Sequence, residues 1–283
     1  MWCFLAPALI VLFVVTILPF IFLIATSFTP YDLTKPDSLR YVGSLNYTEL
    51  VRDDRFWNSV WVQARLSLWT VSLQLLIGLV LARLLHSRIR AVEWVRAGFI
   101  IPMVLPPVAV ALMWRIFFTP DISVLNWLLG LAGLPQPAWL THPTLALWAI
   151  IITDVWEWFP FVLLMLLAAF QMMPDEPLEA ASIDGASPWQ VFRHIELPLL
   201  KPVLVVAGLF RLIDSMKAFP HIFIMTSGGP GVATEATNYY AYLQGFSYTF
   251  IGFSSAITVV MLAATFVLSL AIIRMVGRAA DVE

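Results

Sequence analysis

Six long apolar stretches constrain this chain more than any other feature of its sequence. A helix rises 1.5 Å per residue, so about 20 mostly apolar residues cross a bilayer core. The stretches are residues 4–28, 59–85, 97–119, 145–172, 200–227 and 250–274. Only 12% of the 283 residues are charged and 60% are hydrophobic, whereas about a quarter of a soluble domain is charged. The sequence therefore predicts an all-α integral membrane protein with six transmembrane helices, in one domain covering residues 1–283.

Two of these stretches have special features. Residues 2–28 contain no charge and lack the basic start and cleavage pattern of a signal peptide, so we expect a retained span. So little chain precedes it that we expect the native N-terminus upstream of Met1. The third stretch carries Pro102, Pro106 and Pro107. Because proline has no N–H and clashes with the preceding turn, we expect this span to be bent or interrupted.

Lysine and arginine indicate the orientation, because they are enriched in cytoplasmic loops. The segments expected inside contain Arg83, Arg88, Arg90, Arg96, Arg193, Lys201, Arg274 and Arg278. Residues 120–144 and 228–249 contain neither residue type. Residues 29–58 carry four such cations and oppose this arrangement, but the other segments outweigh them. We therefore expect both termini in the cytoplasm.

Cytoplasmic residues 174–200 read PDEPLEAASIDGASPWQVFRHIELPLL and predict a helix, a break and a second helix. Pro177 is suited to the first turn of the first helix, and Glu179 to its positive end. Gly185 is suited to ending that helix or to close approach of another backbone. Ser187 and Gln190 have the spacing of a capping box for the second helix.

The same loop carries a motif. Its fixed positions are Glu179, Ala180, Ala181, Gly185, Ile195, Leu197 and Pro198. This pattern resembles the EAA loop of binding-protein-dependent ABC importer permeases. The resemblance implies that the loop forms coupling helices, which dock on a cytoplasmic ATPase.

Other segments are similar to the carbohydrate-uptake branch of that family. They are residues 5–8, 27–29, 42–47, 55–58, 102–107 with Trp114, 154–156, 160–161 and 227–231. The resemblance implies a multi-pass subunit of the bacterial inner membrane. Its partners would be a second homologous permease, two copies of an ABC ATPase and an extracytoplasmic solute-binding protein. The chain lacks the two extra N-terminal spans and the large periplasmic insertion of the larger maltose permease, so maltose itself is not carried over.

Motifs for chemistry within this chain are missing. The sequence contains no G-x-x-x-x-G-K-[ST] loop, so we expect ATP and Mg²⁺ to bind the partner ATPase. The sequence Gly228-Gly229-Pro230-Gly231 has no following lysine and predicts a turn. His86, His142, His194 and His221 lack metal-ligand spacing, so we expect loop or interface positions for them. We therefore expect a non-catalytic subunit without a cofactor or metal.

Charged residues within the predicted spans identify candidate functional positions. Asp154 and Glu157 lie in the fourth span, and Arg211, Asp214 and Lys217 in the fifth. A charge at mid-bilayer costs on the order of 3 kcal/mol, so such residues normally pair or face a cavity. Both groups lie about 15 Å deep, and antiparallel neighbours would bring them level.

Two interpretations of these charges remain open. They form structural ion pairs, or some of them line a solute path in which Trp114, Trp156 and Trp158 offer ring faces to a sugar. For the whole chain we expect an importer subunit that moves a sugar-like solute by alternating access. The alternatives are an ion-coupled secondary transporter using Asp154 and Glu157, or an intramembrane enzyme. The transporter alternative does not explain the 174–200 motif, and protease sequence motifs are missing around Asp154 and Asp214. The sequence does not identify the solute.

Overall fold

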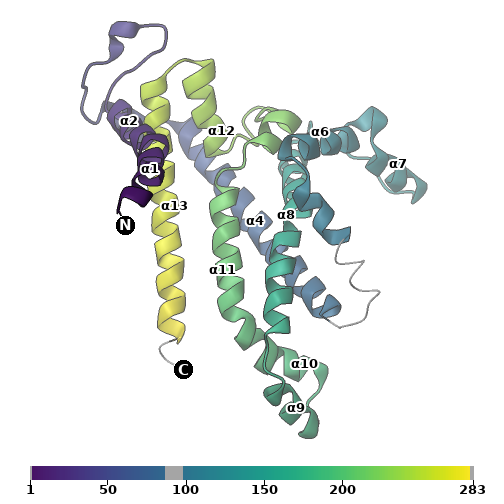
Figure 1. The fold of residues 1–283 in the computed structure, drawn as a ribbon. Coiled ribbons are helices and arrows are strands. Elements are labelled where there is room, and N and C mark those ends of the chain that lie inside the picture. The colour runs from purple at the N-terminus through teal and green to yellow at the C-terminus, as the bar shows by residue number, and fades with distance from the viewer. Residues whose placement is uncertain (1, 87–97, 281–283) are drawn as a thin grey trace. The chain divides into compact units, whose positions relative to one another are not determined.

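The computed structural model describes residues 2–86 and 98–280 (Figure 1), with backbone alone at 2–5, 36 and 275–280. All regular structure in these ranges is helical. The α-helices are α1 (Trp2–Leu12), α2 (Leu18–Ser27), α3 (Leu45–Arg52), α4 (Asp54–Leu85), α6 (Pro107–Phe118), α7 (Val124–Leu131), α8 (Pro143–Gln171), α9 (Glu176–Ile183), α10 (Pro188–Val191), α11 (Leu197–Ser215), α12 (Thr237–Tyr242) and α13 (Ile251–Ala280). Short 3₁₀ or π-helical turns occupy Phe13–Ile17, Pro36–Ser38, Pro120–Ile122, Phe192–Glu196, Ile222–Thr226 and Leu243–Ser247.

Several of these helices are suited to crossing a membrane. Within the described ranges, four are long and apolar enough: Ala6–Ser27, Asp54–Leu85, Pro143–Gln171 and Ile251–Arg274. A fifth is added if Gly98–Val104 and Pro107–Phe118 are counted as one broken span. These helices correspond to five of the six predicted stretches and support a multi-pass membrane protein.

The predicted interruption of the third stretch is confirmed. The helix bends by 107° between its two halves, Gly98–Val104 and Pro107–Phe118. Pro106 adopts an extended backbone, with φ −61° and ψ 133°, and Pro107 begins α6. The bend lies where successive prolines remove the amide donors that a continuous helix requires.

The predicted fifth stretch, 200–227, was wrong as a single helix. α11 ends at Ser215, and the Lys217 amide turns back to the Asp214 carbonyl at 2.9 Å. Pro220 follows, and a helix continuing through it would clash with the carbonyl four residues earlier. α11 contains Lys201, Arg211 and Asp214 and is not among the apolar helices above.

The chain divides into two compact units. One contains Met1–Gln63 and Glu235–Val267, and the other contains Ala64–Thr234 and Leu268–Glu283. Two of the three boundaries fall within α4 and α13, so each of these helices contributes to both units.

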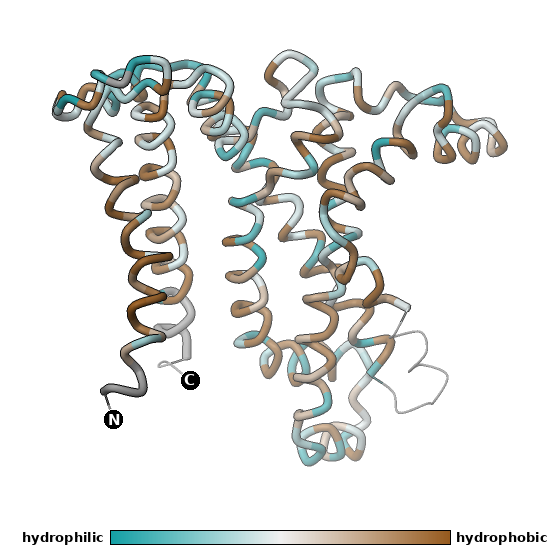
Figure 2. Tube along the Cα trace, turned by 45° about the horizontal axis from the view of Figure 1, so that its top comes forward, coloured by the Kyte–Doolittle hydropathy of each residue, from teal (hydrophilic) through white to brown (hydrophobic). Residues whose placement is uncertain are grey.

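The first unit combines α1 to α3 and α12 with the beginnings of α4 and α13. α2, which is strongly apolar, runs beside the first part of α13 (Figure 2), and Thr26 Oγ1 contacts Ser255 Oγ at 2.9 Å. The most apolar window of Ala6–Ser27 is 0% buried, as expected for a lipid-facing helix. Arg55 forms a bidentate pair with buried Glu235, both N···O distances being 2.7 Å.

The second unit is built around α8 and α11, which run side by side (Figure 1). Their core contains Val162, Leu163, Leu166, Leu200, Ala207 and Ala82 of α4. Gly78 allows α4 to approach α8 closely, because a Cβ there would lie 2.6 Å from Val162 Cγ1. α9 and α10 lie at one end of α8 and α7 at the other, as the predicted loop arrangement requires.

Some predictions lie outside these ranges. Arg88, Arg90 and Arg96, which supported the orientation, belong to residues 87–97 and are not described. The Arg278 side chain is likewise outside the described set. The cytoplasmic placement of the termini stays a prediction.

Candidate functional site

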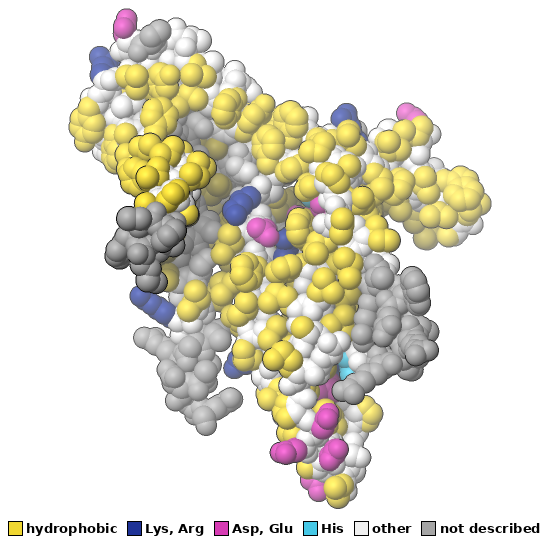
Figure 3. Space-filling model, viewed as in Figure 1, with side chains coloured by type: hydrophobic (Ala, Val, Ile, Leu, Met, Phe, Trp, Pro, Cys, Tyr) yellow, Lys and Arg dark blue, Asp and Glu magenta, His cyan; other side chains and the backbone are white. Residues whose placement is uncertain are grey.

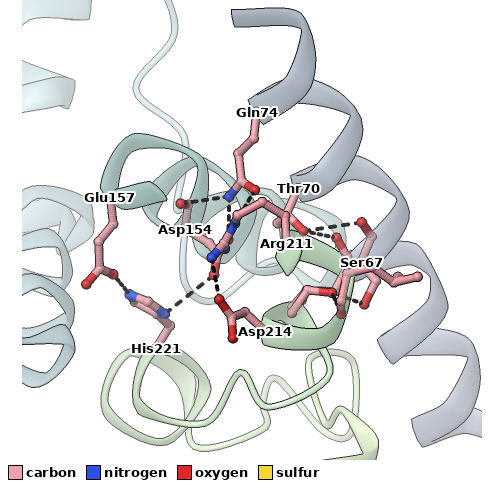
Figure 4. A network of polar contacts seen from close by, with 11 residues as sticks. Ser67, Thr70, Gln74, Asp154, Glu157, Arg211, Asp214 and His221 are labelled. Carbon is pink, nitrogen blue, oxygen red and sulfur yellow. Dashed lines mark hydrogen bonds and ion pairs between the residues drawn. The ribbon is translucent and has the colours of Figure 1, made fainter. Parts of the chain in front are cut away.

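A buried charge pair joins α8 to α11 at the centre of the second unit (Figure 4). Arg211 Nη2 lies 3.4 Å from Asp154 Oδ1, with the two side chains 2% and 6% exposed. The antiparallel packing therefore brings the two predicted groups level. A buried charge without a partner is strongly unfavourable, so each of these residues depends on the other.

Gln74 of α4 completes this pair. Its Nε2 donates to Asp154 Oδ1 at 2.8 Å and to the Asp154 carbonyl at 3.1 Å, and its Oε1 accepts from Arg211 Nε at 2.9 Å. One fully buried amide thus bonds both ions. Three helices, α4, α8 and α11, are therefore joined here by buried polar contacts.

Glu157 does not bond Arg211 but lies beside His221. His221 Nε2 is 2.7 Å from Glu157 Oε2, although the atoms are not aligned as a hydrogen bond, and its Nδ1 is 4.0 Å from Asp154 Oδ2. Glu157 and His221 are 0% and 3% exposed. His221 therefore lies in the interior beside two acids, and the expectation of a loop or interface position missed this environment.

Asp214 and Lys217 lie at the open side of the cluster. Asp214 Oδ2 accepts from Arg211 Nη1 at 3.2 Å, and its Oδ1 is 4.0 Å from Lys217 Nζ. Their side chains are 50% and 69% exposed. Next to them, buried Ser215 donates to Ser67 of α4 at 2.8 Å. Asp214 is thus the most exposed acid of this cluster.

The tryptophans of the predicted path separate into two places. The Arg211 guanidinium lies over the Trp158 ring, 4.7 Å from its centroid. Trp156 instead meets the Trp114 ring edge-on at 5.6 Å, and Trp114 stacks on Phe118 at 5.3 Å. Trp158 therefore joins the charged cluster, whereas Trp156 belongs to an aromatic group with α6.

The cluster is a set of hydrogen-bonding groups. The Asp154 carboxylate, the Gln74 amide and the Arg211 guanidinium are buried and bond one another, whereas the Asp214 carboxylate is half exposed. Among the described residues, no group of three or more His, Cys, Asp or Glu is arranged to hold a metal ion.

The predicted helix–break–helix at 174–200 is present as α9 and α10. The Ala186 amide bonds the Ala181 carbonyl at 2.9 Å and the Gly185 amide bonds the Ser182 carbonyl at 3.2 Å, which is a Schellman ending. Gly185 has φ +70°, the left-handed conformation that glycine adopts at least cost. Ser187 and Gln190 form the predicted capping box at the start of α10.

The motif positions are distributed over both faces of this loop. Glu179, Ala180, Gly185 and Pro198 are exposed, Ala181 is buried, and Ile195 and Leu197 are half-buried. Acidic side chains gather at the tip around α9 (Figure 3), contributed by Asp175, Glu176, Glu179 and Asp184. Ile183 is 87% exposed and Trp189 62% exposed in the same segment. Within the described residues, the tip is therefore an exposed surface of apolar and acidic side chains.

Comparison with known proteins identifies the family of this chain. Residues 74–281 match the family described as "Binding-protein-dependent transport system inner membrane component". The chain belongs to this family. Both the polar cluster around Asp154 and the α9–α10 loop of this permease lie within the matched residues.

Relatives of this permease are named as ABC transporter permeases. A probable ABC transporter permease, y4oQ of Sinorhizobium fredii, is 35% identical over 99% of this chain and 91% of its own. The trehalose/maltose permease MalF of Thermococcus litoralis is 39% identical over 74% of this chain and 72% of its own. The sulfoquinovosyl glycerol permease SmoG of Agrobacterium fabrum is 35% identical over 96% and 88%.

A solved structure has the same fold. It is a bacterial alginate ABC transporter in complex with an alginate pentasaccharide-bound periplasmic protein. The TM-score is 0.86 at 21% identity, covering 98% of this permease and 94% of that chain.

Sequence reasoning missed Gln74 and the interior role of His221. Gln74 was detectable as an amide within an apolar span, 11 residues from the end of α4 at Leu85. That separation corresponds to about 16 Å, the middle of the bilayer core. His221 carried no such signal, because its position depends on the turn after α11.

Proposed function

We propose that this chain is a membrane-spanning subunit of an ATP-driven importer, carrying a sugar-like solute from an extracytoplasmic binding protein to the cytoplasm. The observation that carries the proposal is the exposed α9–α10 loop at one end of α8 and α11, the two helices that hold the buried charges. ATP hydrolysis would occur on partner subunits, and this chain would supply the path and the coupling surface.

The loop surface supports the ATPase partner. Ile183 and Trp189 are large apolar side chains exposed on a tip that also carries four acidic residues. Exposed apolar groups rimmed by charge are typical of docking surfaces. A partner groove with an apolar floor and basic rim would complement this tip. We propose two copies of the ATPase, one for this chain and one for a second, homologous permease.

The polar cluster supports a solute path. Asp214 is half-exposed, and Arg211 connects it to Asp154 and to Trp158. We propose that Asp214 and Trp158 contact the solute, while Asp154, Arg211 and Gln74 hold the path in place. Glu157 and Lys217 flank this set. Trp156 packs with Trp114, so we propose that it shapes the wall of the path.

A sugar-like solute is the class that the relatives support. The names of two of them specify trehalose or maltose and sulfoquinovosyl glycerol, which are polyhydroxyl compounds. Alternating access would follow if ATP binding moves the α9–α10 loops and the spans attached to them. The location would be the bacterial inner membrane.

The test is reconstitution. This chain, its partner permease, the ATPase and the binding protein are placed in proteoliposomes, and uptake of labelled trehalose, maltose and sulfoquinovosyl glycerol is followed with and without ATP. Uptake that requires ATP and the binding protein is expected. Failure of the chain to co-purify with any ATPase would contradict the proposal. Uptake that needs only an ion gradient would instead favour the secondary transporter, for which the buried Glu157–His221 contact would be the candidate proton site.

A further inference from the structure

Arg83, in the last turn of α4, contacts the second half of the α9–α10 loop. Its Nε bonds Glu196 Oε2 at 2.8 Å, and its Nη2 donates to the Pro188 carbonyl at 2.7 Å. Its guanidinium also lies over the Phe192 ring, 4.6 Å from the centroid. A single side chain therefore holds both ends of the segment 188–196.

The carboxylate in this contact is buried, although the segment around it is half-buried or exposed. Glu196 is 9% exposed, whereas Arg193 and His194 beside it are exposed. The π-helical turn Phe192–Glu196 leads directly into α11. Burying a carboxylate is unfavourable unless a charge and hydrogen bonds compensate it, and Arg83 supplies both. Glu196 occupies the variable position between Ile195 and Leu197 of the motif, so the motif itself did not identify this contact.

α4, unlike α8 and α11, has no direct backbone connection to the α9–α10 loop. α8 leads into the loop and α11 follows it, so the backbone transmits loop movement to both. α4 has no such connection, because Arg83 and Pro188 are 105 residues apart in the chain. Movement of the loop therefore reaches α4 through side-chain contacts.

α4 also holds the amide of the buried cluster. Gln74 and Arg83 lie nine residues apart on one continuous helix, which corresponds to about 14 Å along its axis. Gln74 bonds both Asp154 and Arg211. A displacement of α4 along its axis would therefore alter the hydrogen bonds of the candidate solute path.

We propose that Arg83 is a positioning residue. It holds α10 and the following turn, residues 188–196, against α4, so that a movement of the α9–α10 loop displaces α4 and with it Gln74 and the buried charges. The inference rests on the proposed function, since it assigns a route for coupling within the importer. It requires arginine in particular. The forked guanidinium bonds the Glu196 carboxylate and the Pro188 carbonyl from two different nitrogens, whereas a lysine would have to reach both acceptors from one nitrogen.

The experiment uses the assembled complex in proteoliposomes and measures solute transported per ATP hydrolysed. The variants are Arg83→Gln, Arg83→Lys and Glu196→Gln. Arg193→Gln is the matched control, because it removes an exposed arginine from the same loop. Hydrogen exchange over residues 188–197 is measured in the same samples as a readout that does not depend on transport.

We expect Arg83→Gln and Glu196→Gln to hydrolyse ATP while the transport ratio falls about tenfold, as loss of a charge-assisted hydrogen bond implies. The transport ratio of Arg83→Lys is expected to lie between those of these two variants and the wild type, and the ratio of Arg193→Gln is expected to match the wild type. Faster amide exchange over residues 188–197 is expected in the Arg83 and Glu196 variants but not in Arg193→Gln. If Arg83→Gln yields no complex, the ratio for Arg83→Lys decides: a reduced ratio supports the inference.

Two results would overturn the inference and leave the proposed function intact. One is a wild-type transport ratio in the Arg83 variants. The other is a lower yield of complex whose remaining molecules couple normally, because this indicates a role in assembly alone. A wild-type complex without ATP-dependent uptake would instead overturn the proposed function.

Discussion

Arg211 on α11 and Asp154 on α8 form a nearly fully buried ion pair, with 3.4 Å between Nη2 and Oδ1. Asp214, one turn along α11, bonds the same arginine but is 50% exposed. The two acids therefore differ in what their removal leaves behind. Loss of Asp154 takes from Arg211 its buried ion-pair partner and leaves it with the half-exposed Asp214, whereas loss of Asp214 removes an accessible oxygen.

The buried pair is expected to control assembly. Asp154→Leu alone should destabilise the protein by about 3–5 kcal/mol, because Arg211 loses its buried partner. Combining it with Arg211→Met should recover most of this stability. Thermal unfolding and yield in detergent measure both. An Asp154→Leu variant as stable as the wild type would contradict the pairing. The double variant Arg211→Met with Asp214→Leu is the comparison, because it leaves Asp154 without its arginine.

Asp214→Asn tests the solute path. The exposed pair with Lys217 contributes little stability, since surface ion pairs are worth about 0–1 kcal/mol. We expect normal assembly but roughly ten- to a hundredfold weaker uptake, as expected when a hydrogen bond to a charged acceptor is lost. Uptake per assembled complex is the measurement. Normal uptake by Asp214→Asn would place this carboxylate outside the path.

Gly185 separates backbone geometry from docking. Its φ of +70° costs other residues about 1–2 kcal/mol, although asparagine tolerates it. Within the described chain nothing lies within 4 Å of a Cβ placed there. We therefore expect Gly185→Asn and Gly185→Asp to fold but to lose the ATPase on purification. If Asn retains coupled transport while Ala does not, the backbone conformation matters rather than close contact with the partner.

The orientation can be tested by labelling. Cysteines replace Gln136 and Ile183 in a Cys3→Ser background; both positions are exposed. We expect an impermeant thiol reagent added outside intact cells to label position 136 alone, and position 183 to react only after lysis. The reverse pattern would show that the topology is inverted.

The Arg55–Glu235 pair is expected to hold the first unit together. Glu235 is 2% exposed and accepts two bonds from one guanidinium. Beside it, Tyr240 donates to Asp53, and burial raises the pKa of Tyr240 so that its phenol stays protonated. Arg55→Lys should lose the bidentate geometry and destabilise the unit by about 1–3 kcal/mol. The loss of stability is measured as faster proteolysis within residues 29–58. Arg52→Lys serves as the control and is expected to be cleaved as slowly as the wild type.

The sequence by itself determined the features that depend on neighbouring residues. Apolar length indicated the spans, the prolines at 106 and 107 indicated the bend, and Ser187 with Gln190 indicated the start of α10. The spacing of the 179–198 motif indicated the family, which the match over residues 74–281 confirmed. These signals are local, because propensity, capping and steric exclusion act within a few residues.

The tertiary structure decided which polar groups meet. Gln74 bonds partners 80 and 137 residues away, and Arg211 bonds Asp154 across 57 residues. The turn after Ser215 places His221 against Glu157, and α4 brings Arg83 to Glu196. Such pairs depend on how the helices pack and on how each is rotated about its axis. An apolar stretch does not determine this rotation, because many rotations bury a similar apolar area. In a low-dielectric interior an unpaired charge is unfavourable enough to select one of them.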